Sequence, residues 1–246
     1  MRRIHLCETD STNTYVKNLI QTGIDLSEML LVDADFQTDG RGQNGNSWES
    51  RKGENLTFSL AFRPKEVKAS EQFLISQAIA LAVWRTLSDI MVGVTIKWAN
   101  DIYWADRKLC GILIECSLVG DRVENCIIGV GLNVNQTVFE SDAPNPASMA
   151  QIIGFSIDRE KILTALMSKF EDYMRLVEGD GRAMIRNEYV SHLYRRRGLY
   201  PFEGKDGTRF EAEVADVEDN GLLVLRTKDG ETRRFEFKEV RWIQNA

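Results

Sequence analysis

Gly40-Arg41-Gly42-Gln43-Asn44-Gly45-Asn46-Ser47-Trp48 separates two apolar segments near the start of this 246-residue chain. Three glycines within six positions allow the backbone to adopt positive φ angles and to approach a ligand closely. Successive amide N–H groups in such a turn can bind an anion, and the Arg41 guanidinium adds a fixed positive group. A mobile surface loop would have a similar composition, so the loop by itself leaves both interpretations open.

The segments that flank this loop exclude the two common glycine-rich nucleotide loops. Segments 29–36 and 55–62 both have the composition of β-strands, so the loop joins a strand to a strand. A Rossmann fingerprint joins a strand to a helix, and a Walker loop requires a Gly-Lys-Ser/Thr sequence that does not follow here. The loop therefore indicates a different ligand-binding fold or a simple hairpin connection.

Beyond the loop, the sequence predicts a mixture of helices and strands. Capping residues and apolar periodicity predict helices that begin near Ser11, at a cap on Ser70, after Asp158, and near Arg182. The long helix after Asp158 is expected to bury a stripe made of Ile162, Leu163, Leu166, Met167, Phe170, Tyr173, Met174 and Val177. Further strands are expected at 94–98, 109–117 and 126–134, the last two joined at Gly120-Asp121. The pattern predicts an α+β fold.

Three of these strand regions carry residues that suit chemistry as well as structure. The strand that leads to Lys97 ends in Asn100-Asp101, which places charged and polar groups at one end of a sheet. Lys108 opens the next strand, and two glycines precede Asn133 in the strand after that, which indicates close backbone approach or a bulge. Taken singly, each has an ordinary explanation: a solvated strand end, or an edge charge that discourages aggregation.

A second domain is expected after Arg195-Arg196-Arg197-Gly198. Short alternating segments and closely spaced turn signals follow, which predict a small antiparallel barrel of about five strands. The first domain is therefore expected to span residues 1–195 and the second domain residues 198–246. The second domain has eleven acidic residues against eight basic ones, which is the wrong sign for a surface that binds nucleic acid.

Composition narrows the class of protein further. Hydrophobic residues make up 43% of the chain and the net charge is −6, as in an ordinary globular protein without a strongly basic surface. No apolar run is long enough for a signal peptide or a membrane span, so a cytoplasmic protein is expected. The four cysteines form no Cys-x-x-Cys pair and are interpreted as reduced core residues, and two histidines are too few for a histidine-built metal site.

Taken together and in order, the motifs resemble the biotin–protein ligase family over essentially the whole chain. The family signatures correspond here to Ser11-Thr12-Asn13, Gly40 to Trp48, Lys97 to Asp101, Lys108 to Glu115, and Gly129 to Asn133. The resemblance implies a mixed-sheet catalytic domain like that of class II aminoacyl-tRNA synthetases and biotin/lipoate ligases, followed by an SH3-like barrel. It implies the short form of the family, without an N-terminal DNA-binding domain.

The resemblance also implies roles for individual residues. Biotin would be bound by Ser11, Thr12, Gln37, Gly40, Arg41, Lys108 and Gly111. ATP would be bound by Arg41, Trp48, Lys97, Asn100 and Asn133. The residues expected to act in catalysis are Lys97, Lys108, Arg41 and Asp101.

The expected reaction has two steps. Biotin and ATP form biotinyl-5′-AMP, with Mg²⁺ on the ATP phosphates and no dedicated protein metal site. A lysine of the biotin carboxyl carrier protein of a biotin-dependent carboxylase then accepts the biotin. Two departures from the family pattern stand out: Ala99 replaces the usual proline, and Gln43, Asn44, Asn46 and Ser47 replace basic residues of the loop. A less rigid turn at Ala99 and weaker retention of the adenylate are expected consequences.

Two other functions remain open at this stage. A lipoate or octanoate ligase would share the architecture, although lipoate lacks the urea group that Ser11, Thr12 and Gln37 are expected to recognise. A biotin-binding scaffold without activity is the other possibility, and the retained Arg41 and Lys108 argue against it. A homodimer is compatible with the family, in which monomers and dimers both occur.

Overall fold

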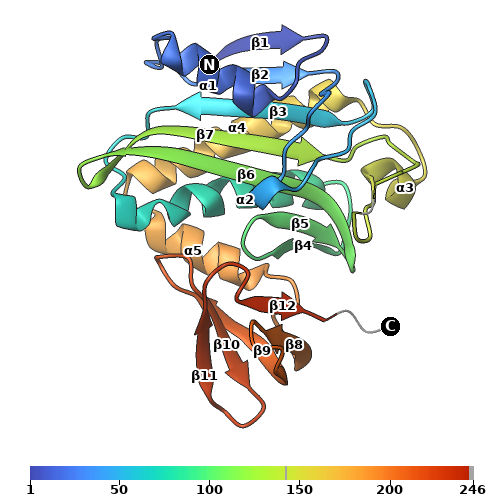
Figure 1. Cartoon of the computed structure of the whole chain (residues 1–246), viewed down its shortest axis with the longest axis vertical. Coiled ribbons are helices and arrows are strands. Elements are labelled where there is room, and N and C mark those ends of the chain that lie inside the picture. Colours follow the sequence, from blue (N-terminus) through green and yellow to red (C-terminus); the bar gives the residue numbers. More distant parts are fainter. Residues whose placement is uncertain (142, 244–246) are drawn as a thin grey trace.

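The computed structural model describes residues 1–141 and 143–243 as two β-sheets with five α-helices (Figure 1). The larger sheet has seven strands in the order β1-β2-β3-β7-β6-β5-β4, with β1 and β2 parallel and the other neighbours antiparallel. Its strands are β1 (Arg2–Leu6), β2 (Leu30–Ala34), β3 (Leu56–Phe62), β4 (Val94–Lys97), β5 (Asp101–Trp104), β6 (Arg107–Val119) and β7 (Arg122–Leu132). The expected α+β fold with a mixed sheet is confirmed.

Two layers of helices cover this sheet. One face packs against the main core, to which α2 (Phe73–Ser88), α4 (Arg159–Glu178) and α5 (Arg182–Ser191) contribute, and the short α3 (Met149–Ile153) adds Met149. The other face carries α1 (Thr12–Gln21), which packs in a smaller cluster around Val16, Leu30 and Val32. Residues 78–83 of α2 are all buried, because this helix lies between the sheet and the helices beneath it.

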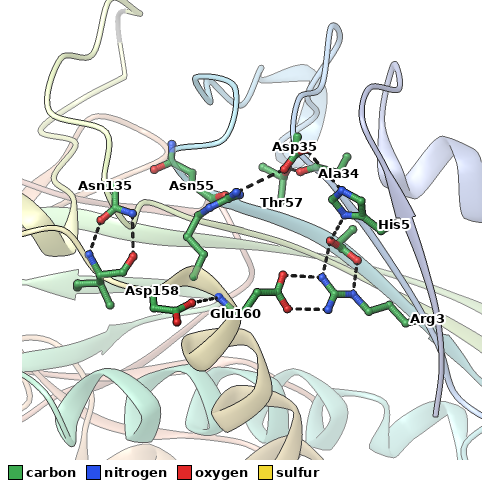
Figure 2. Close-up of polar contacts among 12 residues, drawn as sticks. Arg3, His5, Ala34, Asp35, Asn55, Thr57, Asn135, Asp158 and Glu160 are labelled. Atoms are coloured by element: carbon green, nitrogen blue, oxygen red, sulfur yellow. Dashed lines mark hydrogen bonds and ion pairs between the residues drawn. The ribbon is translucent and has the colours of Figure 1, made fainter.

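Helix α4 follows the sequence prediction closely. Asp158 is its N-cap and accepts hydrogen bonds from the backbone N–H groups of Glu160, at 3.0 Å, and Lys161, at 3.4 Å. The buried residues of this helix are the predicted apolar stripe. A charged cluster ties its first turn to the edge of the sheet: Arg3 pairs with both Asp33 and Glu160 at 2.7 Å, and His5 Nδ1 lies 2.7 Å from Asp33 (Figure 2).

The second sheet lies at the C-terminal end of the molecule, next to α5 (Figure 1). It is antiparallel, with the strand order β11-β10-β9-β8-β12. Its strands are β8 (Tyr200–Gly204), β9 (Arg209–Val217), β10 (Leu223–Thr227), β11 (Thr232–Phe235) and β12 (Val240–Trp242). Arg186 of α5 joins the two parts through Asp216, at 2.7 Å, and Trp98 Nε1 donates to the carbonyl oxygen of Gly221 at 3.0 Å.

Three local predictions were wrong, and one short helix was not predicted. Ser70 does not cap α2, because it lies in a preceding 3₁₀ turn and the helix begins at Phe73. Asp101 does not end a strand; it begins β5, which pairs with β4 as a hairpin. Cys7 is exposed and is not a core residue. The short helix α3, capped by Ser148, was not predicted, because five residues carry too little periodicity.

Candidate functional site

The floor of the site is a pair of facing glycines on adjacent strands. Gly111 of β6 is directly opposite Gly131 of β7 in the antiparallel register. A Cβ atom on Gly131 would lie 2.2 Å from Cε2 of Trp48, and one on Gly111 would lie 3.0 Å from Cζ3 of the same ring. The indole of Trp48 therefore lies directly on this floor, in a space that only glycine leaves open.

Trp48 reaches the floor because the glycine loop folds back over the sheet. The backbone N–H of Trp48 donates to the carbonyl oxygen of Gly40 at 2.8 Å. The backbone N–H of Gly42 donates to the carbonyl oxygen of Asn46 at 2.7 Å. Gly40 is fitted to this closure, since a Cβ there would lie 2.4 Å from the carbonyl oxygen of Trp48. Trp48 Nε1 is buried and has no hydrogen-bond partner within the described residues, which leaves a donor available to a ligand.

The N-terminus of α1 forms the polar wall of the site. Gln37 Oε1 accepts hydrogen bonds from the backbone N–H of Thr12, at 2.7 Å, and from its hydroxyl, at 3.0 Å. Ser59 Oγ lies 2.7 Å from Thr12 Oγ1. Ser11 is the N-cap residue and is buried, yet its hydroxyl makes no capping hydrogen bond in the described structure. This wall therefore offers neutral donors and acceptors to a ligand.

A third glycine brings α1 close to the sheet. A Cβ on Gly129 would lie 2.4 Å from Asn13 Oδ1, so this strand position must remain glycine for Asn13 to fit. Asn13 Nδ2 donates to Glu115 at 3.0 Å, and Lys17 pairs with Glu115 at 2.6 Å. These contacts fix the helix N-terminus above β6 and β7. The sequence pointed to close approach at this glycine but did not identify Asn13 as its partner.

Lys108 provides the main positive charge beside the floor. Its ammonium group lies 2.8 Å from Asp101 Oδ1, and both side chains are a little over one quarter exposed. The same ammonium lies 5.7 Å from the centre of the Trp48 ring. Arg41 is more exposed and pairs with Asp39 at 3.3 Å. Two cations thus lie next to the neutral polar wall, an arrangement that suits a ligand with a neutral head and an anionic end.

Lys97 lies apart from these two cations. Its ammonium group donates to the hydroxyl of Tyr103 at 3.0 Å and lies 4.4 Å from the centre of that ring. Burial lowers the pKa of Lys97 below its usual value, and the nearby charge of Asp101 opposes part of that effect. Lys97 is therefore held by an aromatic hydroxyl rather than by a close carboxylate.

Most of the predicted site residues line one cavity, which we call the inner cavity. Its lining includes nine of them: Ser11, Thr12, Gln37, Arg41, Trp48, Asn100, Asp101, Lys108 and Gly111. Phe237 and Lys238, in the turn between β11 and β12, complete its wall. No motif pointed to these two residues, because they lie in a turn more than a hundred positions away from the strands that form the floor.

The other predicted residues lie outside the inner cavity. Lys97 lines a neighbouring space between the two sheets, which we call the inter-sheet cavity and which shares Trp98, Asp101, Phe237 and Lys238 with the inner one. Gly40 is buried at the start of the glycine loop, and Asn133 is buried just after β7. Asn133 Nδ2 donates to the carbonyl oxygen of Ala147 at 3.0 Å, while its Oδ1 is buried without a partner in the described structure.

Metal-binding groups and membrane helices can be assessed for residues 1–141 and 143–243. In that part of the chain, no cluster of three or more His, Cys, Asp or Glu side chains could hold a metal ion. No helix there combines the length and the apolar character that crossing a membrane requires.

Comparison with known proteins gives consistent matches. The model of the biotin/lipoate A/B protein ligase family matches residues 6–133. A biotin–[acetyl-CoA-carboxylase] ligase of Paracoccus denitrificans is 30% identical over 92% of this chain and 94% of its own length. The bifunctional ligase/repressor BirA of Bacillus subtilis is 31% identical over 82% of this chain, which spans 63% of that protein.

Solved structures agree on the fold. A biotin protein ligase from Aquifex aeolicus, in complex with biotin and ATP, matches with a TM-score of 0.80 over 98% of this chain and 99% of that one. One from Leishmania major, in complex with biotinyl-5-AMP, matches with a TM-score of 0.66 over 96% of this chain. Sequence identities of 23% and 21% mean that these two matches describe the fold alone.

Proposed function

This chain belongs to the biotin/lipoate A/B protein ligase family, and we propose that it is an ATP-dependent biotin–protein ligase. It forms biotinyl-5′-AMP from biotin and ATP, and then transfers biotin to a lysine of a biotin carboxyl carrier protein. One observation carries the proposal: a neutral hydrogen-bonding wall, the Lys108 ammonium and a glycine floor line the same cavity.

The neutral wall suits the head group of biotin. A ureido ring presents N–H donors and a carbonyl acceptor without charge, and Ser11, Thr12 and Gln37 offer matching uncharged groups. Lipoate has no such ring and would make fewer hydrogen bonds with this wall. We assign Gly111 to the biotin site because it keeps the surface of β6 free of a side chain beside Trp48 and Lys108, and Gly40 allows the loop to close over the ligand.

The cations suit the acid end of biotin. In the first step, a biotin carboxylate oxygen attacks the α-phosphorus of ATP, and the bond from that phosphorus to the departing pyrophosphate breaks. Two anions must approach to roughly 3 Å for this attack, so their mutual repulsion adds to the barrier. Lys108 and Arg41 offset this repulsion most strongly when charge builds up on the phosphoryl oxygens. Lys97 supports the phosphate chain from the neighbouring cavity.

Contacts to the nucleotide are assigned to Trp48, Asn100 and Asn133 in addition to Arg41 and Lys97. The unpartnered Nε1 of Trp48 and the unpartnered Oδ1 of Asn133 support this assignment, because buried polar atoms normally have partners. Asn100 lines the inner cavity next to Asp101. We assign Mg²⁺ to the phosphates of ATP, because this ion usually binds through substrate phosphates rather than in an all-protein cage.

The second step requires a neutral amine from the carrier. The lysine nitrogen attacks the acyl carbon of the mixed anhydride, and the bond from that carbon to the AMP oxygen breaks. We assign to Asp101 the task of orienting the amine and accepting its proton, because its carboxylate borders both cavities. The Trp48 loop, closed over the floor, keeps water from the anhydride.

The proposed domain organisation follows the two sheets. Residues 1–195 form the catalytic domain and residues 198–246 form a small C-terminal domain that we assign to the SH3-like barrels, in keeping with its five antiparallel strands. Phe237 brings this second domain into contact with Trp98, with ring centres 5.9 Å apart. The small domain therefore completes the site and is in a position to meet the carrier protein.

Pyrophosphate exchange into ATP tests the proposal directly. The enzyme is incubated with ATP, Mg²⁺ and labelled pyrophosphate, with biotin, lipoate or octanoate as the only added acid. Exchange that depends on biotin supports the first half-reaction. Exchange that depends on lipoate or octanoate instead would show that the protein is a lipoate or octanoate ligase. If no exchange occurs with any of the three acids, the ligase function is refuted.

A further inference from the structure

Two cysteines face each other across the hairpin of β6 and β7. Cys116 and Cys126 are directly opposite in the antiparallel register, and their sulfur atoms lie 3.1 Å apart. Side chains that are directly opposite in such a ladder point to the same face of the sheet, with Cα atoms about 4.5 to 5.5 Å apart. A disulfide spans Cα separations of about 4.4 to 6.8 Å, so the backbone at this pair already accommodates one.

The two thiols differ in their access to solvent. Cys126 is fully buried in the main core, whereas Cys116 is partly exposed. Cys116 also lines a third cavity, of about 550 Å³, which we call the side cavity; residues of α2, of β6 and of the C-terminal turns at 220–222 and 236–237 line it. A small oxidant can therefore reach the sulfur of Cys116 first.

The contact between the sulfurs also separates their reactivity. The hydrogen bond between them stabilises the Cys116 thiolate and lowers the pKa of Cys116 below its usual value, and burial opposes part of that effect. The same hydrogen bond, together with burial, raises the pKa of Cys126. Because the thiolate is the reactive form of cysteine, Cys116 is the better nucleophile of the pair.

The other two cysteines are placed differently. Cys110 of β6 is opposite Leu132 and is fully buried, and this burial raises its pKa. Cys7 is exposed and lies just beyond the end of edge strand β1. The chain therefore contains one buried and one accessible thiol with which the facing pair can be compared.

We propose that Cys116 and Cys126 form a redox site, at which a hydroperoxide converts the two thiols into a disulfide that joins β6 to β7. The Cys116 thiolate attacks a peroxide oxygen, the O–O bond breaks, and the sulfenic acid of Cys116 forms as the released hydroxide takes up a proton. The sulfur of Cys126 then attacks the sulfenic sulfur; the S–S bond forms, the S–O bond breaks and water leaves with the Cys126 proton. The pair loses two electrons and the peroxide gains them, and an added dithiol reverses the reaction.

Oxidation of the full, reduced chain with hydrogen peroxide tests this proposal. After the reaction, free thiols are blocked, and the protein is digested with trypsin and a glutamate-specific protease without reductant. Cleavage after Glu115, Arg122 and Glu124 places the two cysteines in separate peptides that contain no other cysteine. We expect these two peptides to be linked, and to separate when dithiothreitol is added.

The rates at the individual thiols decide the proposal. In the parent, the linked pair should form at least about tenfold faster than Cys110 is oxidised. Equal rates at Cys110 and Cys116 would overturn the proposal. So would a peroxide dose that oxidises Cys7 and leaves Cys116 and Cys126 as free thiols.

Three variants assign the roles of the two sulfurs, with circular dichroism as a check on their folding. In Cys126→Ala the first step remains, so the sulfenic acid of Cys116 should accumulate and react with dimedone. In Cys116→Ser, buried Cys126 should stay reduced. Cys110→Ala is the matched control, because it also removes a buried thiol from the same sheet, and it should form the disulfide at the rate of the parent. Oxidation of Cys126 in folded Cys116→Ser at the parent rate would contradict the assigned order of attack.

Discussion

Lys108→Ala tests the electrostatic core of the proposed mechanism. The substitution removes an ammonium group whose only acidic contact in the described structure is Asp101, at 2.8 Å. Both side chains are partly exposed, so losing the pair should cost the fold at most about 1 kcal/mol. The variant should therefore remain folded, which makes its kinetics interpretable.

The effect on the reaction should be much larger. A cation directed at oxygens that gain charge in the transition state contributes about 3 to 4 kcal/mol, as removal of a single oxyanion donor does in other enzymes. We therefore expect kcat/KM for biotin-dependent pyrophosphate exchange to fall about 10²- to 10³-fold. Most of this loss should appear in kcat, because the interaction is strongest in the transition state.

Lys169→Ala is the matched control. Lys169 lies on α4, forms an ion pair with Asp89 and has a side chain about as buried as that of Lys108, but it lines neither cavity. Thermal unfolding and exchange kinetics should be measured on both variants. The reasoning is refuted if Lys108→Ala keeps exchange within about threefold of the parent, or if Lys169→Ala loses as much activity.

Three further predictions concern the floor, the sheet edge and the long helix. Gly131→Ala would place a Cβ 2.2 Å from Cε2 of Trp48 and expel the indole, so a red-shifted tryptophan emission and a roughly tenfold higher KM for ATP are expected; unchanged emission would contradict the packing. The hydrogen bond to Asp33 raises the pKa of His5, so its stabilisation is complete below the unfolded-state pKa and is lost as the pH rises through the folded-state pKa. In urea unfolding, His5→Gln should therefore be destabilised relative to the parent at roughly pH 5.5 and much less at roughly pH 8.5; a gap that does not change with pH would contradict this. Asp158→Ala should lower the free energy of unfolding by about 1 kcal/mol through loss of the helix cap, whereas Asp158→Asn should retain most of it; equal losses would show that capping is not the cause.

The sequence was sufficient where the determining interactions are local. The buried stripe of α4 and its Asp158 cap were predicted, because both depend on residues within a few positions of one another. The hairpin of β6 and β7 followed from a turn at Gly120 between two apolar segments. The motifs also identified most of the residues that line the inner cavity, because they recur together in the family.

Local signals failed where competing interactions decide the outcome. Ser70 is a good capping residue, but the chain enters α2 through a 3₁₀ turn and the helix starts at Phe73. Asn100-Asp101 has the composition of a strand end, yet pairing between β4 and β5 makes Asp101 the start of the next strand. Cys7 follows an apolar segment and is nevertheless exposed, since it lies just beyond the end of edge strand β1.

The sequence by itself determined the family, the mixed α+β fold and the list of polar residues available for chemistry. Only the tertiary structure decided that Trp48 lies on Gly111 and Gly131, and that Lys97 faces a separate cavity from Lys108. It alone brought Lys238, from the other end of the chain, to the junction of the two cavities. The physical reason is that these positions depend on strand register and on packing between two sheets, which residues distant in sequence fix jointly.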